Sequence, residues 1–212
     1  MRMPTALYEP GSWFDRAMTF VLSNLVWFVL SVIILPMPAA TAGLFAVLAP
    51  WVRGRDVEFF STFFGTMRRK WLKSTVIVLV DVVIVVLLVV NFRILNFMGL
   101  PDPLLWLFRG VYLAMTVVAL LTNLYLWPLL VLFDLGFRRL LNVSVRLAFA
   151  FPLWSALTLF LAALPLSLLL FAPLWLGVMG LVSLGVLIIN WGTWRVIQQV
   201  ATPEELAELD HP

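Results

Sequence analysis

The chain has 212 residues, of which 63% are hydrophobic and only 12% are charged, with a formal net charge of +3 and no cysteine. Soluble domains average roughly 45–50% apolar and about 25% charged residues, so too few charges are present here to cover a soluble core. The composition argues against a water-soluble fold, and the lack of cysteine excludes disulfides, thiol catalysis and cysteine-based metal sites. The sequence therefore predicts an all-α membrane protein.

Six apolar segments follow one another along the chain. They lie at 18–35, 39–51, 74–95, 104–133, 153–171 and 174–194. A hydrocarbon layer of ~30 Å takes about 20 helical residues, and five of the segments approach or exceed that length. The second segment is short, so we expect either a deeply packed span or a re-entrant segment. A single polytopic domain over 1–212, with about six transmembrane helices, is the predicted architecture.

The basic residues predict an orientation. If all six segments cross and the N-terminus is cytoplasmic, 12 of the 14 lysines and arginines lie inside, and only Arg93 and Arg109 lie outside. The positive-inside rule then favours a multi-pass protein with both termini in the cytoplasm. A re-entrant second segment would instead move the N-terminus outside. Because the basic residues report topology, we expect a lipid bilayer and no nucleic acid as partner.

Two amphipathic stretches, 57–71 and 134–149, connect spans on the basic side. Aromatic and basic residues recur in both at helical spacing, which predicts two helices that lie in the cytoplasmic interface. The residues expected to meet lipid headgroups are Arg68, Arg69, Lys70, Trp71, Arg138, Arg139 and Arg146. The likeness of the stretches suggests an internal repeat, although any cytoplasmic connector can gather arginine and aromatic residues.

The last residues, 196–212, are expected to form a short cytoplasmic tail. Thr202, Pro203 and Glu205 have the pattern of an N-cap, a first-turn proline and a capping-box glutamate. This pattern predicts a short acidic helix that ends near Leu209.

Polar residues inside the predicted spans form the candidate site. Asp81 is the only carboxylate well inside a span, where a charge costs about 2.5–3.5 kcal/mol. Asn24, Asn123 and Asn190 could join it in one intramembrane polar cluster. The cluster has two interpretations: a proton or cation site coupled to transport, or a structural group that pins helices together.

The short second segment carries small residues along one side. Ala39, Gly43, Ala46 and Pro50 follow one another at helical spacing. This pattern predicts close backbone contact with a neighbouring helix, and short segments of this kind can also mark transporter sites.

Enzymatic function is not expected. The sole histidine, His211, lies in the polar tail, so it cannot join an intramembrane catalytic or metal site. One membrane carboxylate cannot form an aspartyl dyad, and no Walker-type glycine-rich loop appears. The sequence thus predicts no catalytic residues, no metal site and no cofactor.

The N-terminal third resembles a known family. Asn24-Leu-Val-Trp27, Pro36 or Pro38, Thr41-Ala-Gly43 and the aromatic-basic stretch that follows are similar to the YesL-like family of bacterial membrane proteins of unknown function, over about 14–75. The resemblance implies a bacterial cytoplasmic membrane and a link to carbohydrate uptake, and it implies no catalytic residues.

Two functional hypotheses follow. The first is a non-enzymatic accessory protein that binds a membrane transporter complex. The exposed aromatic-rich spans could equally meet lipid or a second copy of the chain in a homo-oligomer. The alternative is a small transporter or channel with a polar site around Asp81. A permease role is less favoured, because no Glu-Ala-Ala motif followed by glycine is found.

Overall fold

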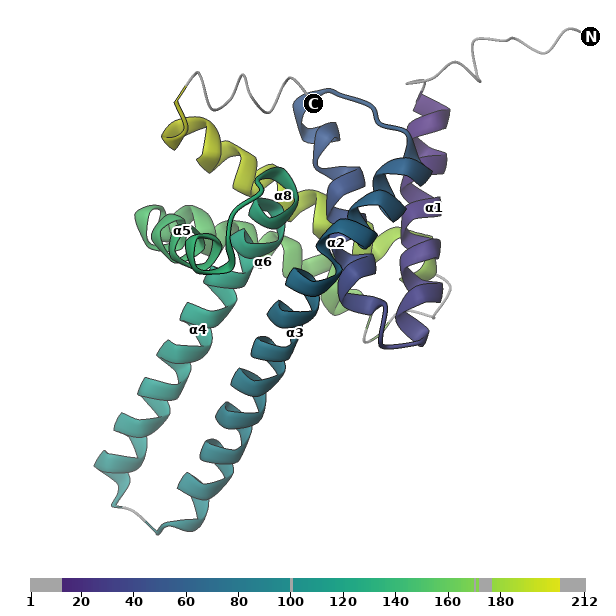
Figure 1. Ribbon diagram of the computed structural model, residues 1–212. Coiled ribbons are helices and arrows are strands. Elements are labelled where there is room, and N and C mark those ends of the chain that lie inside the picture. The colour runs from purple at the N-terminus through teal and green to yellow at the C-terminus, as the bar shows by residue number, and fades with distance from the viewer. Residues whose placement is uncertain (1–12, 100, 170, 172–176, 203–212) are drawn as a thin grey trace, which may run out of the picture.

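The computed structural model of the chain describes residues 13–99, 101–169, 171 and 177–202, and these form helices and no strands. The elements are α1 (Trp13–Val32), α2 (Met37–Leu48), the 3-10 helix η2 (Pro50–Arg53), α3 (Phe59–Phe97), α4 (Asp102–Leu132), α5 (Phe137–Ala150), α6 (Pro152–Leu168), the π-helical turn η3 (Gly177–Leu181) and α8 (Val182–Val200). Most of them form a body, from which α3 and α4 project as a long hairpin (Figure 1). The predicted all-α class is confirmed.

The helices include several candidate membrane spans. By length and composition α1, α3 and α4 could each cross a bilayer, and a fourth span is added if α5 and α6, bent by 101°, count as one. Apolar helices of this kind indicate a membrane protein. The count is lower than the six segments expected from sequence, partly because α2 has only 12 residues and α6 has 17.

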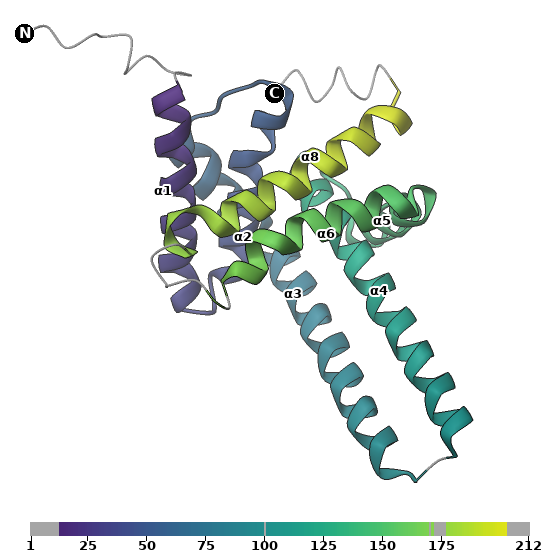
Figure 2. The ribbon, with the colours of Figure 1, turned by 180° about the vertical axis from the view of Figure 1, so that it is seen from behind.

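The short helix α2 lies at the centre of the body, between α1 and the first part of α3 (Figures 1 and 2). Nine of its twelve residues are buried. A Cβ added to Gly43 would lie 2.9 Å from the backbone oxygen of Phe63 in α3. The predicted close backbone contact of the small-residue side is confirmed at Gly43.

One long helix replaces the predicted interfacial helix 57–71 and the separate span 74–95. α3 has 39 residues, which corresponds to about 58 Å. No proline lies between Phe59 and Phe97, so nothing ends the helix near Trp71. In contrast, Phe151 leaves the helical region at φ −130° and ψ 61° before Pro152, and this separates α5 from α6. The two units of the suggested repeat therefore differ at this junction.

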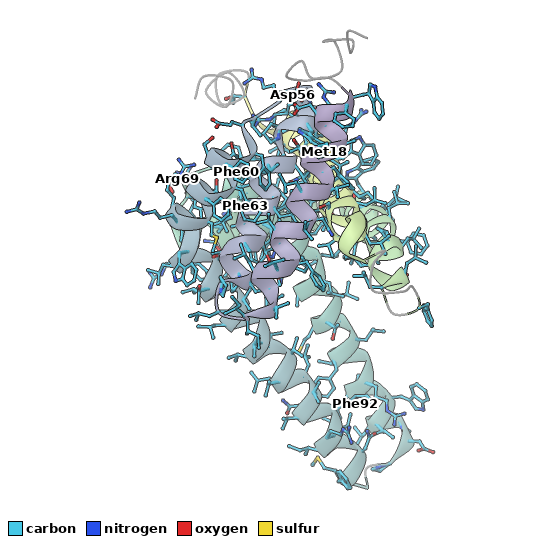
Figure 3. The ribbon with its side chains drawn as sticks, turned by 90° about the vertical axis from the view of Figure 1, so that its right-hand side faces the viewer. Met18, Asp56, Phe60, Phe63, Arg69 and Phe92 are labelled. Atoms are coloured by element: carbon cyan, nitrogen blue, oxygen red, sulfur yellow. The ribbon has the colours of Figure 1, made fainter. Side chains whose placement is uncertain are left out.

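The aromatic stripe of 57–71 does not share one environment. Phe63 is fully buried against α2, whereas Phe60 and Phe64 are 60% and 43% exposed. Figure 3 labels Phe60 and Phe63. The stripe that packs consists instead of Phe59, Phe63 and Thr66. Two neighbouring faces of α3 thus carry the aromatic residues, one turned to the core and one turned outward.

The C-terminal helix is longer than expected. α8 continues to Val200 instead of ending near Trp194. The predicted acidic helix from Thr202 to Leu209 lies outside the described residues, apart from Thr202 itself.

Candidate functional site

The α3–α4 hairpin is largely exposed. It leaves the body at Ile77 and returns at Leu121, which are 2% and 7% exposed, and of the described residues between them only Leu95 is buried. Its outer faces are apolar, with Val86 52% exposed. Arg93 follows Lys73 by twenty residues, which corresponds to about 30 Å of helix, the thickness of a hydrocarbon layer.

A row of polar residues lies where the two helices of the hairpin face each other. Half-buried residues recur there at spacings of three, four and seven, which places them on one side of each helix. We call the polar members the polar seam: Asp81, Asn91, Arg109, Tyr112, Thr116 and Asn123.

Hydrogen bonds join the two helices near both ends of the hairpin. At the inner end Asn123 Nδ2 donates to Asp81 Oδ1 over 2.7 Å. At the outer end Arg109 Nη2 donates to Asn96 Oδ1 over 3.1 Å. The structure thus brings together two of the four residues expected in the intramembrane cluster.

The polar seam keeps unused hydrogen-bonding groups. Among the described residues, none donates to the second carboxyl oxygen of Asp81 or pairs with the Tyr112 hydroxyl, and Arg109 Nε is buried without a partner. Polar groups left unpaired in apolar surroundings are costly. The seam holds one carboxylate, and no three metal-ligating side chains gather within the described ranges, so we assign no metal site. What the seam offers is donors and acceptors for another helix or a polar ligand.

Arg109, Tyr112 and Thr116 were not predicted from the sequence as parts of a site. Their spacing on α4, with Asn123 two turns further on, was the signal available. A polar residue that recurs on one face of an apolar helix indicates a protein-facing or water-facing side.

The other two predicted cluster residues lie elsewhere in the body. Asn24 of α1 is fully buried; its Nδ2 donates to Gly177 O over 2.8 Å, and its Oδ1 accepts from Ser183 N over 3.0 Å. Asn190 of α8 donates to Phe45 O of α2 over 3.3 Å. Asn24, Asn190 and the Asp81–Asn123 pair therefore occupy three separate helix contacts.

The predicted lipid-interface residues divide into exposed and paired side chains. Arg68, Arg69 and Trp71 on α3, and Arg138, Arg139 and Arg146 on α5, are all exposed. Lys70 differs, because it donates together with Lys73 to Asp134 Oδ1, each over 2.9 Å. These two hydrogen-bonded ammonium groups lower the pKa of Asp134 to about 2. The ion pair ties α3 to the loop that precedes α5.

A second ion pair joins α1 to the loop that precedes α3. Arg16 Nε of α1 lies 2.8 Å from Asp56 Oδ1, in the loop before α3. Figure 3 shows Asp56 at the end of the molecule opposite to Phe92 of the hairpin. Both ion pairs join segments that the sequence assigns to one side of the membrane.

Comparison with known proteins gives two matches. Residues 20–92 match the family described as "Protein of unknown function, DUF624". The chain is also 29% identical over 144 residues to the uncharacterized protein YesL of Bacillus subtilis (strain 168), an alignment that covers 66% of this chain and 65% of that protein's length. No solved structure matches the chain. These matches confirm the resemblance inferred from the N-terminal third: the chain is similar to the YesL protein, and its residues 20–92 match a family whose function is unknown.

Proposed function

We propose that the chain is a non-enzymatic accessory protein of the bacterial cytoplasmic membrane, which binds another membrane protein through the α3–α4 hairpin. The observation that carries the proposal is the polar seam, with its unused donors and acceptors between two apolar helices. We propose a carbohydrate-uptake transporter as the partner, and the support for that class of partner is the family resemblance alone.

The polar seam favours a protein partner over lipid. Lipid tails can cover the apolar faces of the hairpin, but they offer no hydrogen-bond donor to Asp81 and no partner to Tyr112. A helix of another protein could supply both. Interhelical hydrogen bonds in membranes contribute roughly 0.6–2 kcal/mol each, and packing against rigid valine faces would add to that.

The proposal retains six apolar segments with both termini in the cytoplasm. Its support is that the Arg16–Asp56 and Lys73–Asp134 ion pairs join segments assigned to the cytoplasmic side. α5 keeps the role of an interfacial helix. In the stretch 57–71, the exposed rings of Phe60 and Phe64 on the first turns of α3 contact the lipid of the cytoplasmic interface.

The test is purification in a gentle detergent from the native host at endogenous expression, with bound proteins identified by mass spectrometry. The wild-type chain should bring down one membrane protein in stoichiometric amount. Tyr112→Phe removes a hydroxyl that has no partner in the described structure, so it should leave folding intact and reduce recovery of the partner several-fold. Tyr125→Phe is the matched control, because the Tyr125 hydroxyl pairs inside the body with Ser155. A chain recovered alone, or only with itself, would contradict the proposal.

The alternative is a small transporter or channel that uses the polar seam itself. The observation in its favour is that polar side chains follow one another along the hairpin from Arg109 to Asp81. Asp81→Asn separates the two functions. Lost flux at unchanged thermal stability would support transport, whereas retained partner binding without any measurable flux would support the accessory role.

A further inference from the structure

A cleft opens on the body close to Asp134. It has a volume of about 510 Å³ and lies between the end of α4, the loop to α5, α5 itself and the end of α8. Leu129, Leu132, Leu147 and Ile197 give it an apolar floor, and Asp134 and Arg139 are its charged residues. Figures 1 and 2 show α5 lying across the end of α4, with the end of α8 beside it. Its volume is that of an ordinary small-ligand site.

The mouth of the cleft is positively charged. Lys70 and Lys73 both pair with Asp134, so two ammonium groups face one carboxylate. Arg139 is exposed and has no ion-pair partner among the described residues. Lys70, Lys73 and Arg139 together with Asp134 give a net charge of +2. Arg138 adds a further positive charge on α5, next to Arg139 in the sequence. Such a mouth attracts an anionic group.

The hairpin sets the depth of the cleft in the bilayer. Lys73 and Arg93 bound an apolar stretch of about 30 Å, so Lys73 lies at the headgroup level of one leaflet. Asp134 accepts a hydrogen bond from Lys73 and therefore lies at the same level, and α5 begins three residues later, at Phe137. The charged mouth thus meets headgroups, while the apolar floor can take a hydrocarbon chain.

We propose that this cleft binds one anionic phospholipid of that leaflet, with the headgroup phosphate at Arg139 and an acyl chain against Leu129, Leu147 and Ile197. A water-soluble anion would use the mouth and leave the apolar floor empty. A neutral lipid would use the floor and leave the positive charge uncompensated. An anionic lipid satisfies both parts of the cleft, and this site does not depend on the hairpin's partner.

The test uses the purified full-length chain in detergent, titrated with phosphatidylglycerol or phosphatidylcholine of identical acyl chains and followed by native mass spectrometry. One phosphatidylglycerol should bind per chain, with at least fivefold preference over phosphatidylcholine. Arg139→Gln should weaken it about fivefold, as expected for one cation at a membrane surface. Arg69→Gln, an exposed cation of α3 outside the cleft, should change binding less than twofold. Equal binding of both lipids, or equal effects of the two variants, would overturn the proposal.

Two further variants test the cleft itself. Val143 lines it and is half-buried, so Val143→Trp fills the space and should abolish binding of the anionic lipid, with helix content and melting unchanged. Retained binding by that folded variant would overturn the proposal. Replacing Glu204, Glu205 and Glu208 with Gln should leave lipid binding unchanged, because the proposed site uses residues of α4, α5, α8 and the loop before α5. A several-fold loss of binding would show that the lipid depends on those glutamates and would overturn the assignment to this cleft.

Discussion

Replacing Gly192 with alanine should disrupt the packing of α8 against α6. A Cβ at Gly192 would lie far inside van der Waals contact with both Cγ2 and Oγ1 of Thr158. The helices cannot simply separate there, because the indole of Trp154 donates to the Gly192 carbonyl over 2.9 Å. Relief of the clash therefore requires a shift of α6 and loss or lengthening of that hydrogen bond.

The magnitude follows from two opposing effects. Overpacking a well-packed contact costs about 1–3 kcal/mol, while glycine-to-alanine substitution in a helix otherwise gains roughly 0.5–1 kcal/mol. Because the clash is severe, the upper part of the overpacking range applies, about 2–3 kcal/mol, and we expect Gly192→Ala to lower the free energy of unfolding by a net of roughly 1–2.5 kcal/mol. Gly65→Ala in α3, where no atom lies within 4 Å of the new Cβ, should instead raise it. Thr158→Ala removes two of the three close contacts and should restore part of the loss.

The assay is reversible unfolding in mixed detergent micelles, with SDS as denaturant and tryptophan fluorescence as the signal. The reasoning would be refuted if Gly192→Ala proved as stable as Gly65→Ala, since α6 and α8 could then not be packed as described.

Three further predictions use the same molecule. Asn24→Leu leaves buried groups at Gly177 and Ser183 unpaired and should cost roughly 2–4 kcal/mol of unfolding free energy; a loss below the error of the SDS titration would contradict it. Tyr125→Phe removes the 2.7 Å bond to Ser155 and should cost about 0.5–1.5 kcal/mol in that titration; a gain would be the contrary result. The pKa of Asp134 falls from 3.8 unfolded to about 2 folded, so its stabilisation is present above pH ~4 and lost between about pH 4 and 2. Hydrogen exchange of loop 133–136, corrected for intrinsic rates, should therefore rise only below pH ~4; a rise near pH 6 would disprove the pairing.

The helical class and several boundaries could be predicted because the bilayer sets them. An apolar run long enough to cross hydrocarbon must pair its backbone internally, which a helix does. The segment 104–133 accordingly matches α4 (Asp102–Leu132) closely. Continuity of the backbone was harder to predict, since charged residues near Trp71 indicate a membrane boundary and do not themselves end a helix. The helix break before Pro152 has a local cause in Phe151, which leaves the helical region, whereas Pro128 and Pro165 lie inside α4 and α6.

The helical spacing of the aromatic residues could not predict toward which neighbour each side chain points. Phe60 and Phe63 are three residues apart and both aromatic, yet Phe63 is fully buried against α2 and Phe60 is 60% exposed. Whether an aromatic stripe meets lipid or protein depends on the neighbouring helix, which is distant in sequence.

Within the candidate site, a lone carboxylate in an apolar run was visible at once, and Asp81 does lie against Asn123. Asn24 could not be assigned its partners, because Ser183 is 159 residues away and the contact depends on tertiary packing. The polar seam could have been predicted only from the regular spacing of Tyr112 and Thr116 on α4. Each of these residues alone is an ordinary residue for a membrane helix.

Site-specific photo-crosslinking from the hairpin tests the accessory role most directly. The chain has no cysteine, so Val86→Cys on α3 or Val29→Cys on α1 gives a unique attachment point for a benzophenone probe, and the two positions are similarly exposed at 52% and 57%. In native membranes, Val86 should give one discrete adduct with a second membrane protein and Val29 should not. Adducts to lipid alone from Val86, or the same protein adducts from both positions, would contradict binding through the hairpin.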